Sequence, residues 1–218
     1  MVPARFAPVL DELRPLVERF STAGHRLYLV GVLVRDLLLG DVDIAGADFD
    51  LTTDARPETI KQLVDGWAQA TWTQGEAFGT IGAIRRRDGH ERRYEITTFR
   101  ADVYRSESRK PVVTFADDIV GDLGRRDFTI NAIALELHDA ADLSPELIDP
   151  FGGAADLAAG VLRTPQAPEV SFDDDPLRML RAARFIARFD LAPTDELRNA
   201  VSERGERLSI VSAERIRD

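Results

Sequence analysis

The sequence has 218 residues, with 38 acidic and 28 basic side chains and a formal net charge of −10. Hydrophobic residues make up 44% and charged residues 30%, which is typical of a globular protein and excludes disorder of the whole chain. The absence of cysteine excludes disulfides, thiol nucleophiles and cysteine-bound metals. The acidic balance argues against a surface that coats nucleic acid, but it is compatible with a local basic site.

Neither a membrane span nor a secretory signal is expected. The longest apolar runs, such as 37–39 and 133–135, are far shorter than the roughly 20 residues that a bilayer requires. Charged and apolar residues alternate over residues 1–20, which is not typical of a signal peptide. The sequence therefore predicts a cytoplasmic protein.

Hydrophobic periodicity predicts a first part in which helices and strands alternate. Asp88-Gly89 is a strong turn signal between two strand-like runs and predicts a β-hairpin. Asp54 is expected to cap the helix that begins near Pro57. In chain order, the expected elements are a helix over 7–23, a strand over 26–30, a helix over 33–39, a loop over 41–47, a strand over 48–52, a helix from Pro57 to about Trp67, and a hairpin formed by 80–87 and 92–99.

The second half of the sequence changes character. Residues 100–115 are polar and charged, and predict a mobile loop, whereas residues 127–137 predict a helix. Beyond 149–153 the strand signals stop, and helices are expected over 173–189 and 195–218.

These patterns predict an α+β protein, with a mixed β-sheet head flanked by helices and an all-helical neck. The head is expected over 1–140 and the neck over 141–218. Because Asp218 falls inside an expected helix without a glycine stop, we expect the sequence to be truncated there.

Asp48-Phe49-Asp50 lies on an expected strand. Residues two apart on a strand point to the same face, so the two carboxylates lie side by side while Phe49 points into the core. Like charges so placed repel unless a cation neutralises them, and carboxylates are ligands that Mg²⁺ prefers. Glu95 could complete a metal site if its strand lies beside this one. The simpler interpretation is a set of solvated acids at a strand edge.

Three further segments carry candidate binding residues. Gly31 joins a strand to a helix, a position where backbone N–H groups can bind phosphate, and Arg35 could reach the same group. Arg126 precedes a helix that Asp127 could cap. Asp175 and three arginines recur every three residues and could read the edge of a base, although ion pairs on a solvated helix face explain them as well. The three arginines are Arg178, Arg181 and Arg184.

Taken in order, these segments resemble the class II tRNA nucleotidyltransferase/poly(A) polymerase family, which includes the bacterial CCA-adding enzymes. The resemblance runs from about Leu27 to the last residue. The segments that carry it are YLVGVLVRDLLLG, DFDLTTDARPE, EITTFR, DLGRRDFTINAIA, DPFGGAADL, DDPLRMLRAARFIARF and SAERIRD.

The resemblance implies transfer of nucleotides from CTP and ATP to the 3′ end of tRNA, with Mg²⁺ as the cofactor. Metal binding would fall on Asp48 and Asp50, with Glu95 as a third catalytic carboxylate. Residues 100–115 would correspond to the family's flexible loop. Nucleotide binding would fall on Gly31, Val32, Arg35, Arg126, Asp175, Arg178, Arg181 and Arg184.

Val32 departs from the family pattern, which has a second glycine there. A branched side chain disfavours positive φ and blocks close approach of a ligand, so weaker triphosphate binding is expected. Two alternatives follow from the sequence. One is a poly(A) polymerase, since the motifs are shared, and the other is a catalytically impaired module that binds NTP or tRNA.

Overall fold

The computed structural model describes residues 4–40, 47–103, 112–116, 118–138 and 145–211. The chain folds into two compact units. The first comprises residues 1–122 and 133–148, and the second comprises 123–132 and 149–218. The boundary between head and neck at residue 140 stays a prediction. The chain passes from one unit to the other three times, after residues 122, 132 and 148.

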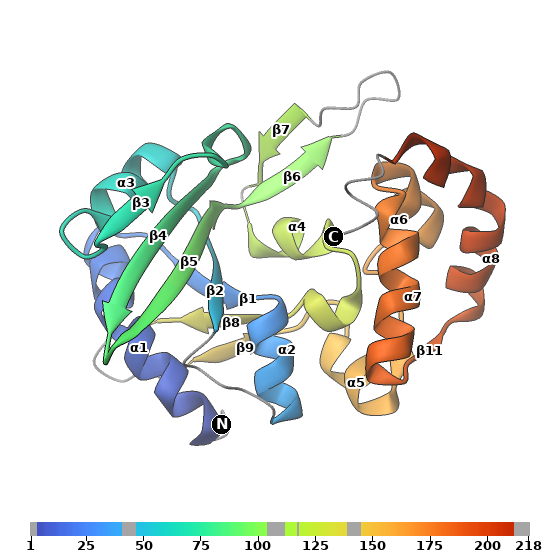
Figure 1. Cartoon of the computed structure of the whole chain (residues 1–218), viewed down its shortest axis with the longest axis horizontal. Helices are drawn as coiled ribbons and strands as arrows, with labels where there is room; N and C mark the ends of the chain where they lie inside the picture. Colours follow the sequence, from blue (N-terminus) through green and yellow to red (C-terminus); the bar gives the residue numbers. More distant parts are fainter. Residues whose placement is uncertain (1–3, 41–46, 104–111, 117, 139–144, 212–218) are drawn as a thin grey trace. The chain divides into compact units, whose positions relative to one another are not determined.

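A seven-stranded mixed sheet forms the centre of the first unit, with the strand order β3-β4-β5-β2-β1-β8-β9 (Figure 1). Only β2 and β5 pair in parallel among its described strands, and all other neighbours are antiparallel. This sheet confirms the predicted α+β class. Its strands are β1 (Leu27–Val30), β2 (Asp48–Thr53), β3 (Ala70–Trp72), β4 (Thr80–Arg87), β5 (His90–Thr98), β8 (Ala134–Leu137) and β9 (Glu146–Ile148).

One face of this sheet is buried beneath two helices. Phe49 and Tyr94 stack there with ring centroids 4.8 Å apart, and Trp67 packs edge-on against Tyr94 at 4.9 Å. Glu12 reaches the same face from α1 and accepts a hydrogen bond of 2.7 Å from the Tyr94 hydroxyl. The helices of the first unit are η1 (Ala4–Phe6), α1 (Ala7–Thr22), α2 (Val32–Leu39), α3 (Pro57–Val64), η3 (Glu76–Phe78) and α4 (Ile119–Gly124), of which α4 runs on into the second unit.

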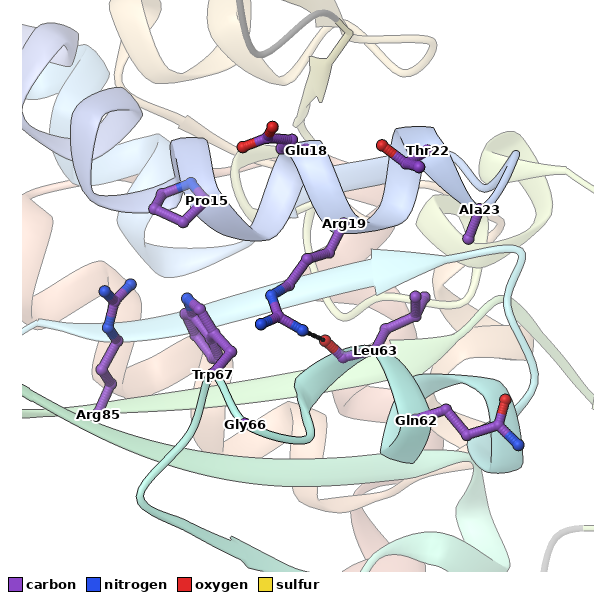
Figure 2. A pocket seen from close by; sticks show the side chains of 10 residues that line it. All are labelled: Pro15, Glu18, Arg19, Thr22, Ala23, Gln62, Leu63, Gly66, Trp67 and Arg85. Atoms are coloured by element: carbon purple, nitrogen blue, oxygen red, sulfur yellow. Dashed lines mark hydrogen bonds between the residues drawn. The ribbon is translucent and has the colours of Figure 1, made fainter.

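Arg19 ties α1 to the end of α3. Its Nη1 atom donates a hydrogen bond of 3.1 Å to the carbonyl oxygen of Leu63 (Figure 2). The same atom donates one of 3.1 Å to the carbonyl oxygen of Asp65, the residue after the helix. The groove beside it holds about 710 Å³, and Arg85 lies over the Trp67 ring at 5.1 Å from its centroid. The bonds of Arg19 hold α3 on the buried face of the sheet. The opposite face of β2 and β5 remains for polar side chains.

Asp54 does not cap α3 as predicted. Its Oδ1 atom lies 2.9 Å from His25 Nδ1 and accepts a hydrogen bond from the Arg26 backbone, while its Oδ2 atom accepts one from Arg26 Nε. Arg56 occupies the cap position without a side-chain bond. Polar groups of His25 and Arg26 therefore take the carboxylate that the first turn of α3 would otherwise use.

The predicted helix over 127–137 is wrong. The chain forms a short 3-10 helix, η4 (Thr129–Asn131), and then strand β8 between β1 and β9. Residues 132–135 are all completely buried. Because both faces of this strand are covered, its apolar run is continuous and lacks the alternation that identifies a strand.

The predicted loop over 100–115 is wrong at both of its ends. Strands β6 (Arg100–Val103) and β7 (Val112–Phe115) pair antiparallel, with Ala101 opposite Thr114. Residues 104–111, and residues 41–46 of the predicted loop over 41–47, lie outside the described part of the chain. The hydrogen bonds of a two-stranded ribbon come from the backbone, so charged residues in a segment do not exclude one.

The second unit is helical apart from one pair of two-residue strands, β10 (Val161–Leu162) and β11 (Ala192–Pro193). Its core includes Phe128, Leu162, Phe172, Met179 and Phe185. Its helices are η4, α5 (Gly153–Ala159), α6 (Pro168–Asp174), α7 (Leu177–Phe189), α8 (Asp195–Arg204) and η5 (Gly205–Ile210).

Two of the predicted long helices are shorter than expected. The helix over 173–189 breaks at Asp175, which is extended because Pro176 disfavours helical backbone in the residue before it. The helix over 195–218 ends at Arg204, where a 3-10 turn follows, and residues 212–218 lie outside the described part. None of the helices in the described part is long and apolar enough to cross a bilayer.

Alkaline pH is expected to destabilise the fold through Tyr94. Burial, and then the hydrogen bond to Glu12, raise the pKa of Tyr94 above its ordinary value of 10. The contribution of neutral Tyr94 to the free energy of unfolding is fully present below pH 10. Above pH 10 it declines by about 1.4 kcal/mol per pH unit. Urea unfolding at pH 8 and 11 measures this decline, and Tyr94→Phe should make it shallower. An equal decline in both proteins would contradict the assignment.

Candidate active site

The acidic side chains that the sequence singles out lie on two neighbouring strands. On β2, Asp48 is exposed, Phe49 is fully buried and Asp50 is partly exposed, so the strand alternates as predicted. β5 runs parallel beside it, with Asp50 opposite Glu95 and Asp48 opposite Arg93. Neighbouring strands lie about 4.8 Å apart, so these three carboxylates occupy one polar face.

This polar face has the chemistry for a hard cation. Its donors are carboxylate oxygens, and Mg²⁺ commonly binds through one or two carboxylates together with water and substrate phosphate. The three acids do not converge as tightly as a complete protein cage would require. Among the described residues, the only group of three or more with ligand atoms within 4.8 Å of one another is Glu136, His138 and Glu146, in which His138 Nε2 lies 3.7 Å from Glu136 and 3.9 Å from Glu146.

The glycine turn lies at the same end of the sheet. Leu29 of β1 is opposite Leu51 of β2, so the antiparallel strands bring the turn after Val30 to the start of β2, where the aspartates lie. Gly31 adopts φ 74°, a conformation that favours glycine. Val32 is the first residue of α2 and has no positive φ. The backbone strain expected from valine is therefore absent, and what remains is its exposed side chain.

Arg35 is placed differently from what a phosphate ligand would need. Its side chain is only 2% exposed, and its Nε and Nη2 atoms donate to Asp36 Oδ1 at 2.9 and 2.7 Å. An interaction with phosphate would require this ion pair to rearrange, so that role stays a prediction.

In the second unit, the segment 125–127 is bound directly to α7. Arg178 donates to the Arg125 carbonyl oxygen at 2.5 Å and to Ser171 Oγ at 2.8 Å. Arg181 donates through Nε and Nη2 to Asp127 Oδ2, at 2.8 and 2.6 Å. These bonds place the predicted nucleotide-binding residue Arg126 between two anchored neighbours, beside the arginines of α7.

Asp127 and Asp175 act through bonds that the sequence did not indicate. Asp127 was expected to cap a helix, but Phe128 occupies the cap position of η4 without a side-chain bond, and Asp127 instead accepts from Asn131 and Arg181. Asp175 lies before α7 rather than on it, and its Oδ1 atom accepts a hydrogen bond of 3.1 Å from the backbone of Leu177. Asp175 still lies next to Arg178, whose backbone N–H donates to the Asp175 carbonyl oxygen.

The predicted residues thus form two groups, one in each unit. The first group lies on the polar sheet face and at the glycine turn, and the second lies on α7 and the segment before η4. The sequence missed Ser171 as a partner of Arg178, for which no motif exists, and it missed the anchoring role of Asp127. An arginine-aspartate pair 54 residues apart has no local signal.

Comparison with known proteins identifies the family. Residues 27–163 match the family described as the poly A polymerase head domain. The "CCA-adding enzyme" of Lactobacillus helveticus (strain DPC 4571) is 38% identical over 211 residues, which cover 96% of this chain and 49% of that protein. The chain therefore spans about half the length of the curated relatives it matches.

Solved structures agree with this match. The Bacillus stearothermophilus CCA-adding enzyme in complex with CTP has a TM-score of 0.75 and 32% identity, covering 98% of this chain and 47% of that one. The Thermotoga maritima CCA-adding enzyme complexed with tRNA has a TM-score of 0.74 and 30% identity, covering 96% of this chain and 45% of that one.

Proposed function

Because the chain belongs to the poly A polymerase head domain family, we propose that it is a template-independent nucleotidyltransferase that adds C and A from CTP and ATP to the 3′ end of tRNA. The observation that carries this proposal is the shared position of Asp48, Asp50 and the Gly31 turn at one end of the sheet. A triphosphate needs both features together, namely backbone N–H groups for its phosphates and carboxylates for its metal.

In the proposed reaction, the 3′ oxygen of the tRNA bonds to the α-phosphorus and the bond to pyrophosphate breaks. Asp48 and Asp50 would hold Mg²⁺, which supplies charge neutralisation at the triphosphate and lowers the pKa of the attacking hydroxyl. The Gly31 turn would position the phosphates. Glu95 adds negative charge beside Asp50 and would strengthen cation binding. Positioning and electrostatics account for most of catalysis in such transfers.

Asp175 and Arg178 would select the incoming base. A carboxylate acceptor next to a guanidinium donor matches the mixed donor and acceptor edge of a base. The bonds of Arg178 to Ser171 and Arg125 hold that guanidinium in place, which a selective site requires. The relatives supporting CCA addition over poly(A) addition are named CCA-adding enzymes, so poly(A) synthesis is the less favoured alternative.

The test is incorporation of labelled nucleotides into tRNA that lacks its 3′ CCA end. We expect C and A to be added, at most three nucleotides per tRNA, and neither G nor U. A long A tract would instead identify a poly(A) polymerase. Mg²⁺-dependent binding of CTP or ATP without any incorporation would identify a binding module and contradict the proposal.

Val32→Gly is expected to lower the KM for CTP and ATP about 3- to 10-fold, because it removes a 45% exposed side chain at the phosphate-binding turn. The cost in stability should remain below about 1 kcal/mol. Val120→Gly is the matched control, since Val120 is equally exposed near the start of α4. An unchanged KM would mean that Val32 does not obstruct the triphosphate.

Asp175→Ala is expected to weaken the preference for C and A when all four NTPs are offered. The variant also removes the hydrogen bond from the Leu177 backbone, worth about 1 kcal/mol, which Asp175→Asn would retain. Asp173→Ala, at an exposed aspartate in the same segment, serves as the control. An unchanged preference for C and A would exclude base selection by Asp175.

A further inference from the structure

An indole ring lies on the same sheet as the carboxylates, and no motif accounts for it. Trp72 of β3 is opposite Gly82 of β4, which in turn is opposite Glu95 of β5. Glu95 is opposite Asp50 of β2. These four residues therefore form one row across four neighbouring strands of the sheet.

The Trp72 ring occupies the space above Gly82. A Cβ atom placed on Gly82 would lie 1.8 Å from Cε2 of the indole and 2.2 Å from Cδ2 and Cζ2. The ring therefore covers the glycine backbone and extends across β4 toward β5. Glycine inside a strand commonly marks such a close approach, and here it is the residue that admits the ring.

One side of the indole packs on Gly82, yet Trp72 remains partly exposed. A base could therefore reach the indole only on the side that faces away from Gly82. Strands are about 4.8 Å apart, so the ring lies about one strand spacing from the Glu95 position and two from the Asp50 position. A nucleotide with its sugar at the carboxylates can extend its base over this surface.

We infer that Trp72 is the stacking surface for the 3′-terminal base of the RNA that receives the new nucleotide. This inference rests on the proposed function and adds a binding residue to it. Single-stranded RNA ends are commonly bound by stacking on aromatic rings, and stacking tolerates any base because every base has a π-face. Such tolerance suits an RNA whose terminal base changes after each addition.

Trp72 can be observed directly, because the chain has only two tryptophans. Trp67→Phe leaves Trp72 as the only tryptophan, which can be excited selectively at 295 nm, and changes a buried residue on the opposite face of the sheet. Without NTP, a tRNA ending before the CCA should quench this fluorescence, and the same tRNA with an abasic 3′ nucleotide should quench it at least about 3-fold less. CTP or ATP alone should leave it unchanged.

Kinetics test the same inference independently. Trp72→Leu should raise the KM for tRNA about 10-fold while kcat and the KM for CTP stay within 2-fold, and Trp72→Phe should lie between Trp72→Leu and the unmodified protein. Gly82→Ala, which displaces the ring, should raise the KM for tRNA in the same direction and add little to Trp72→Leu.

Equal quenching by the abasic tRNA, quenching by CTP alone, or an unchanged KM in a folded Trp72→Leu protein would overturn the inference and leave nucleotide addition standing. If the unmodified protein adds neither C nor A, the proposed function fails and the inference fails with it.

Discussion

Replacing Asp48 or Asp50 with asparagine is expected to lower the rate of nucleotide addition by about 100-fold or more. The amide keeps the size of the side chain but removes a charge that the proposed Mg²⁺ site needs, and even indirect partners of a metal contribute 10- to 100-fold in comparable sites. Labelled CTP incorporation measures the effect. The fold should remain intact, because Asp48 is exposed at the start of β2.

Glu91→Gln is the matched control for these variants. Glu91 is an exposed carboxylate on β5, the strand that carries Glu95, and it pairs with Arg86 at 3.1 Å. Its replacement should leave the rate within 2-fold. A fully active Asp48→Asn or Asp50→Asn protein would exclude that residue as a metal ligand.

Replacing Glu12 with alanine is expected to cost about 3 to 5 kcal/mol in the free energy of unfolding. Glu12 is 2% exposed and bonds to the buried Arg92 as well as to the Tyr94 hydroxyl and Arg87. Its loss leaves a buried guanidinium without a counter-charge, which is one of the most costly changes in a protein core. Urea unfolding at pH 7 measures the difference.

Glu18→Ala on the same helix is the control, because Glu18 is exposed and should change stability by less than about 0.5 kcal/mol. Glu12→Leu combined with Arg92→Leu should recover much of the loss, since it removes both buried charges together. A cost below about 1 kcal/mol for Glu12→Ala would mean that water or another group compensates Arg92.

The elements with strong local signals were predicted correctly. The Asp88-Gly89 hairpin forms with φ 53° and 80° at these two residues, the conformation that the two-residue turn requires. The helix over 7–23 is confirmed because its apolar residues recur at helical spacing and all face the core. Local signals of this kind do not depend on distant parts of the chain.

The elements that were predicted wrongly depend on their tertiary surroundings. β8 looked like a helix because burial on both faces removes the alternation of a strand. β6 and β7 looked like a loop because the segment between them is highly charged, whereas their pairing joins residues that are distant in the sequence, such as Ala101 and Thr114. Asp54 stands shortly before a helix in the sequence, where a capping aspartate is common. Only the fold brings His25 and Arg26 within reach of its carboxylate.

The candidate site was predictable in its residues but only partly in its geometry. The spacing of Asp48 and Asp50 already placed both on one face. That Glu95 lies opposite Asp50 depends on the parallel register of β2 and β5, which no short motif encodes. The same holds for the bonds of Arg178 and Arg181 to the segment 125–127, and for the indole that covers Gly82.

The excursion of residues 123–132 into the second unit has a practical consequence for dissecting the molecule. A fragment ending at residue 140 would carry Phe128 and Ile130 without the partners that bury them, such as Phe172 and Phe185. Such a fragment would expose apolar side chains and tend to aggregate. Separate expression of the two units would therefore need a short linker between residues 122 and 133 in the first unit and another between residues 132 and 149 in the second.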